Sequence, residues 1–361
     1  MPFSLAERLR QQIRREGAIT FHDWMQAALY DADGGYYQQP GRERWGREGD
    51  YRTSPERSEL FAATFAGYFA QLSAELDGLT IVECGAGAGH FAAGVLGTLR
   101  DQFPAVFLQT RYVICDISDD ARRRARERLV EFGNRVEIYA QPIAIDSGIY
   151  FANELLDAFP VHRVEQGDAG LMELYVTVDA DGEFQWTTGP LSTPRLAEFC
   201  SRHSIELAPE QIIEINLGID DWLAEVAAKL RQGFLITVDY GSDARGLYEN
   251  WLRLDGTLRG FSRHSFVANV LAQPGEYDLT TTINWDQVIR TSERLGFQLV
   301  EFASQDKFLL KAGLLGQLEK RLSKAESEAD RVALTTGARE MILISGMASS
   351  FQVLVQKKAS L

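Results

Sequence analysis

Three glycines at alternate positions follow a short apolar run and form the most informative feature of the sequence. The segment reads Ile81-Val82-Glu83-Cys84-Gly85-Ala86-Gly87-Ala88-Gly89. Glycine lets a backbone approach a ligand closely, and a helix beginning after Gly89 offers unpaired N–H groups and a partial positive charge. The spacing therefore predicts a binding site for a small ligand that carries a carboxylate or a phosphate.

Two cofactor classes compete for this turn. The dinucleotide pattern G-x-G-x-x-G/A is met in its looser form by residues 87–92, but that register gives Glu83 and Gly85 no role. The pattern E-x-G-x-G-x-G uses Glu83 and all three glycines, and it is typical of class I S-adenosyl-L-methionine (SAM) methyltransferases. An anionic Glu83 would repel a pyrophosphate but can accept hydrogen bonds linked to an ammonium group. We favour SAM, and an NAD(P)-dependent oxidoreductase is the alternative.

A second acidic residue, Asp116, follows the next apolar run. At the end of a second strand, a carboxylate accepts hydrogen bonds from ribose hydroxyls in either cofactor class. The alternative is that Asp116 caps the helix expected over residues 118–132. Its position directly after the strand favours the ribose role, with Ile117 as a neighbouring cofactor contact.

Asn153 and Glu154 end a further apolar run, at the strand edge where ligands of α/β sheets bind. Glu154, together with Asp157 one helical turn later, could orient a guanidinium group through bidentate contacts. Asn153, Glu154 and Asp157 are therefore the candidate catalytic residues. The alternatives are that Asn153 caps a turn, that Glu154 is merely solvated and that Asp157 is an ordinary turn residue. His162 is a further candidate base, although a lone histidine at a strand start is more often structural.

Short apolar runs alternate with helical patterns over the middle of the chain. Strand, helix, strand, helix predicts βαβ units and a parallel sheet. Turn signals at residues 166–168 and 179–182 predict an inserted antiparallel meander, and the runs 297–302 and 351–355 predict a closing pair of strands at one sheet edge. The runs expected in the parallel sheet are residues 79–82, 112–115, 136–139, 149–152 and 234–238.

The expected fold class is α/β. The glycine turn and the family resemblance given below imply a class I methyltransferase Rossmann-like core. The pattern of elements predicts a mostly parallel sheet, an N-terminal helical segment, an inserted antiparallel β meander and a long substrate-side loop. The predicted division is 1–77 for the helical segment and a cofactor-covering loop, 78–160 for the first part of the SAM-binding core, 161–210 for the meander and a helix, 211–240 for the core continued, 241–286 for the substrate-side loop region and 287–361 for the C-terminal part of the core.

Length, charge and cysteine content limit the classes of protein. A chain of 361 residues, 45% of them hydrophobic, can bury a sizeable core. The net charge of −14 repels phosphate backbones and anionic lipid, which argues against nucleic acid as a partner. Cys84, Cys115 and Cys200 are too scattered for a disulfide framework or a metal cluster. These features predict a cytoplasmic protein without a metal site or a membrane span.

Several separated motifs together resemble the MidA-like methyltransferases, a family that includes a mitochondrial complex I assembly factor that methylates a protein arginine. The motifs cover most of the chain and are specific as a set. The resemblance implies a SAM-binding Rossmann-like core and a protein substrate. The motifs are Gly35-Tyr36-Tyr37, the glycine turn, and residues 49–58, 152–162, 236–241, 256–260 and 278–285.

The resemblance also assigns residues to the cofactor site. It places Asp50, Thr53, Ser54 and Pro55 in a segment that folds over the cofactor, the alternative being a capping cluster for a helix that begins at Pro55. Tyr36, Tyr37 and Trp45 could form an aromatic wall on a cation, or simply pack. The predicted cofactor contacts from the core are Glu83, Gly85, Ala86, Gly87, Gly89, Asp116 and Ile117.

The sequence is therefore interpreted as a SAM-dependent methyltransferase acting on a protein side chain, arginine by resemblance. Residues 61–63 read Phe-Ala-Ala where the family tends to have Phe-Gly-Glu, and the second strand ends in Asp116 where Glu is frequent. The altered residues 61–63 and the long loop over residues 241–286 keep a non-catalytic SAM-binding scaffold for a partner protein as an alternative. The expected partners are a protein substrate and a second copy of the chain, with no nucleic acid and no membrane.

Overall fold

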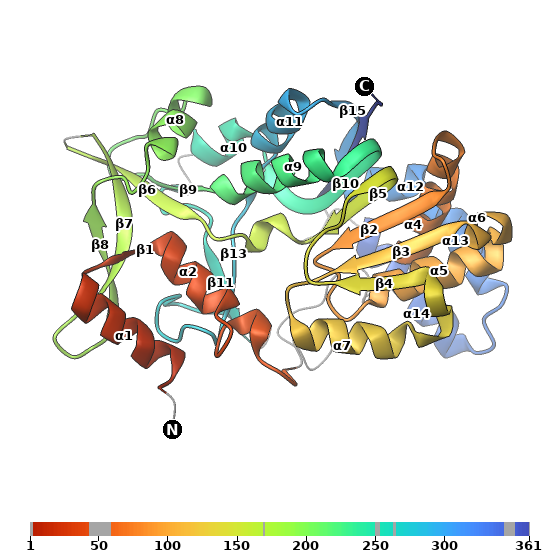
Figure 1. Ribbon diagram of the computed structural model, residues 1–361, viewed down its shortest axis with the longest axis horizontal. Coiled ribbons are helices and arrows are strands. Elements are labelled where there is room, and N and C mark those ends of the chain that lie inside the picture. Colours follow the sequence, from red (N-terminus) through yellow and green to blue (C-terminus); the bar gives the residue numbers. More distant parts are fainter. Residues whose placement is uncertain are drawn as a thin grey trace.

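The computed structural model describes residues 3–42, 59–168, 170–249, 253–262, 265–342 and 351–360. Figure 1 shows a central sheet with helices on both faces, and beside it a second sheet that packs against the N-terminal helices α1 (Leu5–Glu16) and α2 (Phe21–Tyr30). None of the helices in the described ranges is long and apolar enough to cross a lipid bilayer.

The central sheet runs in the order β15-β16-β10-β5-β2-β3-β4, and a two-residue strand, β14 (Ile283–Asn284), also pairs with β10. The neighbours from β10 to β4 are parallel, and β16 is antiparallel to both β10 and β15. The predicted parallel sheet and its closing pair of strands are confirmed. The strands are β2 (Leu79–Cys84), β3 (Thr110–Cys115), β4 (Val136–Tyr139), β5 (Ile145–Asn153), β10 (Leu230–Ser242), β15 (Phe297–Ser304) and β16 (Phe351–Lys358).

Helices bury both faces of this sheet, which explains why its inner strands are continuously apolar. Along β5, Ile149 and Phe151 belong to one hydrophobic cluster, and Tyr150 and Ala152 belong to the cluster on the opposite face. The first cluster is completed by α4 (Glu59–Leu72), α5 (His90–Gln102), α7 (Asp119–Arg128), α12 (Gln305–Lys311), α13 (Leu314–Leu322) and α14 (Glu328–Ile342), and the second by α9 (Leu217–Lys229) and α11 (Trp285–Arg294). The short helix α6 (Pro104–Leu108) precedes β3.

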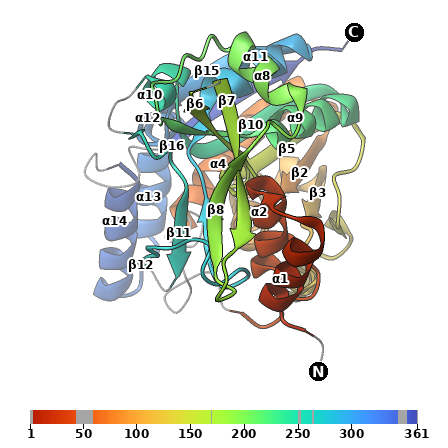
Figure 2. The same ribbon diagram turned by 90° about the vertical axis from the view of Figure 1, so that its left-hand side faces the viewer.

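The second sheet is antiparallel and has the order β1-β7-β6-β9, with β8 paired to β7. Its hairpins β6–β7 and β7–β8 confirm the predicted meander. Phe21 and Trp24 of α2 pack with Val176 and Phe184 of this sheet, and Figure 2 shows both N-terminal helices beside β7 and β8. The strands are β1 (Ile19–Thr20), β6 (His162–Gly167), β7 (Gly170–Val178), β8 (Phe184–Gly189) and β9 (Ile212–Ile215). The helix α8 (Pro194–Arg202) lies between β8 and β9 in the sequence.

The region 241–286, expected as a long irregular loop, contains short elements. Three strands form a small antiparallel sheet in the order β12-β11-β13. β13 brings Asp278 to the 3-10 turn η1 (Tyr36–Gln38), where the Tyr37 hydroxyl donates a 2.6 Å hydrogen bond to Asp278 Oδ1. The elements are α10 (Ala244–Tyr248), β11 (Arg259–Ser262), β12 (Ser265–Phe266) and β13 (Asp278–Thr280).

Candidate functional site

A cavity of about 380 Å³ opens where β2, β3, β4 and β5 end at the carboxyl edge of the central sheet. Ligands of doubly wound folds bind at this edge, and the volume lies in the range of small-molecule sites. The glycine turn, the residues after β3 and β4, and the turn after β5 line the cavity, together with Tyr30 and Tyr37 from the N-terminal segment. Among the described residues, no group of three or more His, Cys, Asp or Glu side chains is arranged to hold a metal ion.

The glycine turn has the conformation that its sequence requires. Gly85, Gly87 and Gly89 all have left-handed backbone, with φ of 69°, 54° and 76°. Gly85, Ala86 and Gly87 line the cavity, whereas Gly89 does not and instead forms the N-cap of α5. A Cβ at Gly89 would approach the Leu129 side chain to 3.1 Å, so helix packing is a sufficient reason for this glycine.

Glu83 lies near the end of β2, is 5% exposed and lines the cavity. The Tyr112 hydroxyl donates a 2.6 Å hydrogen bond to Glu83 Oε2. Burial raises the pKa of Glu83 from 4.5 to about 8, because it outweighs this hydrogen bond, and the nearby Asp116 carboxylate adds to the increase. A cationic ligand group beside Glu83 would favour its ionised form.

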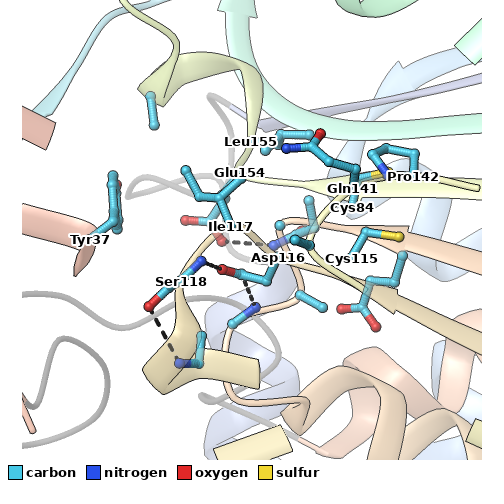
Figure 3. Close-up of a pocket in the computed structure, with 18 of the residues that line it drawn as sticks. Tyr37, Cys84, Cys115, Asp116, Ile117, Ser118, Gln141, Pro142, Glu154 and Leu155 are labelled. Carbon is cyan, nitrogen blue, oxygen red and sulfur yellow. Dashed lines mark hydrogen bonds between the residues drawn. The ribbon is translucent and has the colours of Figure 1, made fainter. Parts of the chain in front are cut away.

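Asp116 follows β3 and lines the cavity, as does Ile117 after it. Asp116 Oδ2 accepts a hydrogen bond from the Gly87 amide at 2.9 Å, and Asp116 Oδ1 accepts one from the Ser118 amide at 2.8 Å. Figure 3 shows both bonds as dashed lines. The N-cap of α7 is Ser118, whose hydroxyl accepts from Ala121. Helix capping therefore does not account for Asp116, which instead joins the glycine turn to the end of β3.

Asn153 and Glu154 end β5 and both line the cavity. Glu154 has φ of 51°, a left-handed conformation that is uncommon for a residue with a side chain and is found at strained functional positions. Its amide donates to the Val238 carbonyl at 2.9 Å, and its Oε1 accepts from Asn153 Nδ2 at 3.2 Å. Figure 3 shows Glu154 between Tyr37 on one side and Gln141 and Pro142 on the other.

Asp157 does not line the cavity. It is 5% exposed, and its Oδ2 accepts a 2.5 Å hydrogen bond from the Tyr240 hydroxyl. Burial raises its pKa to about 6, although the Tyr240 hydrogen bond and the charge of Arg259 oppose the increase. The interpretation of Asp157 and Glu154 as two carboxylates holding one group does not match this geometry, because Asp157 is buried outside the cavity lining and accepts from Tyr240.

Asp239 explains how the turn after β5 is held. This fully buried side chain accepts from the Leu156 amide at 3.0 Å and from the Asp157 amide at 3.4 Å. Both amides belong to the turn that begins at Glu154, including η4 (Leu156–Ala158). Burial and the neighbouring carboxylates of Asp157 and Glu154 raise the pKa of Asp239 well above its usual value. Asp239 therefore holds the turn that follows Glu154.

Several cavity residues were not predicted from the sequence. Tyr30, Gln141 and Trp222 line the cavity, but they come from elements far apart in the chain. Gln141 follows β4, so its place at the end of the third parallel strand was the one available signal. Of the aromatic residues singled out earlier, Tyr37 lines the cavity and Tyr36 is fully buried.

The remaining predicted residues are placed as follows. His162 lies outside the cavity wall, where its ring stacks on His22 and its Nδ1 is 2.7 Å from Glu173 Oε1. These contacts indicate a structural role for His162. Outside the described residues lie Trp45, Asp50, Thr53, Ser54 and Pro55.

Comparisons with known proteins agree with this geometry. A family model for SAM-dependent methyltransferases matches residues 60–303. The chain is 26% identical to the mitochondrial protein arginine methyltransferase NDUFAF7 of Mus musculus and 25% identical to that of Homo sapiens, each match covering 91% of this chain and 78% of the relative. The crystal structure of a Burkholderia thailandensis protein bound to S-adenosyl-homocysteine superposes with a TM-score of 0.89 at 28% identity, covering 99% of this chain and 92% of the other.

The prediction of a cytoplasmic location is contradicted by these comparisons. The relatives from mouse, rat, human and cattle are all named as mitochondrial proteins. The prediction was wrong because scarce, scattered cysteines distinguish reducing from oxidising surroundings and do not identify one reducing compartment.

The residues of the cavity fit SAM. The buried Glu83 carboxylate suits an ammonium group, the glycine turn leaves room for backbone contacts, and Asp116 can accept further hydrogen bonds from hydroxyl groups. Nothing in the geometry or the comparisons favours a dinucleotide. The chain belongs to the family of SAM-dependent methyltransferases, and its cofactor is SAM.

Proposed function

We propose that the chain transfers the methyl group of SAM to a guanidinium nitrogen of a protein arginine. The observation that carries this proposal is Glu154, a carboxylate aimed by a left-handed turn into the same cavity as Asp116 and the glycine turn. The names of the mouse and human relatives as protein arginine methyltransferases support it.

When bound, SAM supplies an electrophilic methyl group. The Glu154 carboxylate accepts hydrogen bonds from the guanidinium N–H groups, which fixes the orientation of the attacking nitrogen. As the new C–N bond forms and the C–S bond breaks, with its electron pair staying on sulfur, one guanidinium proton passes to the Glu154 carboxylate. Asn153 donates to Glu154 Oε1 and thereby fixes the side chain for this task.

We also propose roles on the cofactor side. Glu83 holds the ammonium group of SAM, Asp116 holds the ribose hydroxyls, and Ala86 and Gly87 make backbone contacts. Ile117 is 43% exposed and covers the cofactor from the rim of the cavity. The contacts of Asp50, Thr53, Ser54 and Pro55 stay predictions, as does a homodimer, which light scattering of the purified protein tests.

The test of the catalytic proposal is Glu154→Gln, which keeps the shape of the side chain and removes its charge. Proteins from a lysate are incubated with the enzyme and methyl-labelled SAM, then hydrolysed and analysed for methylated amino acids by mass spectrometry. We expect labelled methylarginine with the wild type, at least about a tenfold loss of transfer in Glu154→Gln, and SAM affinity within about twofold.

Glu301→Gln is the matched control, because Glu301 is a partly buried glutamate on β15 that pairs with Lys311 away from the cavity. It should transfer methyl groups like the wild type. Full activity of Glu154→Gln would remove Glu154 from the mechanism, and label in lysine or in a carboxyl group instead of arginine would overturn the proposed acceptor.

A further inference from the structure

Two tyrosines form one wall of the cavity opposite the cofactor-side residues. Tyr30 ends α2 and Tyr37 lies in η1, and both line the same cavity as Glu154. Their rings are stacked, with centroids 5.4 Å apart and an interplanar angle of 25°. Tyr37 also contacts the fully buried Tyr36 edge to face, at 5.1 Å between centroids. The stack is therefore fixed from behind by packing.

The hydroxyl protons of both tyrosines are already used inside the protein. Tyr30 donates to the Ala158 carbonyl at 2.8 Å, and Tyr37 donates to Asp278 Oδ1 at 2.6 Å. A phenol has a single proton to donate. Neither hydroxyl can therefore donate to a ligand, and the wall offers ring faces and acceptor oxygens only.

The charges around the cavity favour a cationic ligand. Glu154 lies in the wall, and the Asp278 carboxylate lies behind Tyr37. In the part of the chain that the structure describes, no lysine or arginine side chain lines the cavity. A carboxylate or phosphate acceptor would find no lysine or arginine among these described residues, whereas a cation would find ring faces and a carboxylate.

We propose that the Tyr30–Tyr37 stack is the acceptor subsite and selects a planar cation. The guanidinium group lies against the tyrosine rings while its N–H edge faces Glu154, so that one ligand satisfies both contacts. An ammonium group meets the charge requirement but lacks the planar edge, and it binds less tightly. This inference rests on the proposed function, because it names the surface that receives the arginine.

The direct test measures binding without turnover. The full chain saturated with S-adenosyl-homocysteine is titrated in a calorimeter with n-butylguanidinium, n-butylammonium and butyrate. We expect n-butylguanidinium to bind at least threefold more tightly than n-butylammonium, and butyrate not to bind. Equal binding of butyrate and n-butylguanidinium by the wild type would overturn the proposal without any variant.

Variants then assign the binding to the stack. Tyr37→Leu removes the ring and should weaken n-butylguanidinium binding at least tenfold, whereas Tyr37→Phe keeps the ring and should stay within about threefold of the wild type. Tyr175→Leu is the matched control, because Tyr175 on β7 donates to the Pro190 carbonyl as Tyr30 does to Ala158, outside the cavity wall. Unchanged S-adenosyl-homocysteine affinity shows that each variant is folded.

The outcomes separate this inference from the proposed function. If Tyr37→Leu binds n-butylguanidinium and forms methylarginine like the wild type, the subsite is wrong and the function stands. If guanidinium binding depends on Tyr37 but hydrolysates contain no methylarginine, the subsite stands and the proposed function fails. If Tyr37→Leu does not fold, Tyr30→Leu and the wild-type probe series decide the question.

Discussion

Glu83 is expected to release a proton when SAM binds. In the free protein its pKa is raised to about 8 by burial, so at pH 7 most of the molecules carry a protonated Glu83. The ammonium group of SAM favours the ionised form, because an opposite charge a few ångström away lowers a carboxyl pKa. Once the bound-state pKa falls below about 6, nearly one proton leaves for each SAM bound at pH 7.

The size of this effect follows from the burial of Glu83. The difference between a pKa of about 8 in the folded chain and 4.5 for an exposed glutamate corresponds to on the order of 5 kcal/mol of cost for the charged form. The Kd for SAM should therefore rise by up to about tenfold for each pH unit below about 8, until the bound-state pKa is reached. The same linkage makes the free energy of unfolding of the free protein fall as pH rises from about 4.5 to 8, because the folded chain holds the proton more tightly in this window.

The assay is calorimetry of SAM binding at pH 7 in two buffers whose ionisation enthalpies differ, which gives the number of protons released. Glu83→Gln should abolish the release and flatten the pH dependence of the Kd, leaving only the titration of the SAM amine itself. The matched control is Glu137→Gln on β4. Arg111 and Tyr139 lower the pKa of Glu137 to about 2, so it is already ionised and its loss should leave the release unchanged. A wild-type release near zero, or an unchanged release in Glu83→Gln, would refute the reasoning.

Four other substitutions test the remaining parts of the site. Gly87→Val should abolish SAM binding while the chain stays folded, because the left-handed φ of 54° and the cavity both disfavour a branched side chain; unchanged affinity by calorimetry would contradict the role of the turn. Asp116→Ala should weaken SAM by about 1.5 to 3 kcal/mol, and an unaltered Kd with a lower melting temperature would mean that the carboxylate only supports the backbone. Asp239→Asn should lower kcat at least about threefold with a near-normal Kd for SAM, because it disturbs the turn that aims Glu154, and an unchanged kcat would show that the turn holds without it. Asp157→Asn should reduce the loss of stability between pH 4 and 7, because the pKa of about 6 makes the wild type lose stability as pH rises through this window; parallel pH profiles of denaturant unfolding would contradict that expectation.

Much of the fold could be predicted because its strands have strong local signals. The run over residues 149–152 is apolar on both faces, which is typical of an inner parallel strand. In the structure this run belongs to β5, which lies between β2 and β10 and is parallel to both. The strands of the region 241–286 could not be predicted, because elements of two to four residues have no measurable period. β1 has the same limitation, since its two residues become a strand only by pairing with β7.

Some residues of the site could be predicted from the sequence and others could not, for the same reasons. The place of the glycine turn in the cavity lining could be predicted because its residues are adjacent in sequence, and that of Asp116 because the end of the next strand lies beside the turn. Tyr30 could not, because its place in the cavity depends on a helix packed against a turn more than a hundred residues later. Asp157 was misplaced for a related reason: its partner Tyr240 comes from another strand, and no local pattern indicates that it is buried.

The hydrogen bond from Tyr30 to the Ala158 carbonyl joins the end of α2 to the turn after β5. This bond connects two stretches of the chain that both line the cavity. Most of the described lining comes from the stretch that runs from β2 to the turn after β5, and α9 adds Trp222 and Glu225. The two tyrosines come from the N-terminal segment. A substitution at Tyr30 or Tyr37 therefore changes the wall that the N-terminal segment contributes and leaves the residues of the glycine turn and the end of β3 unchanged.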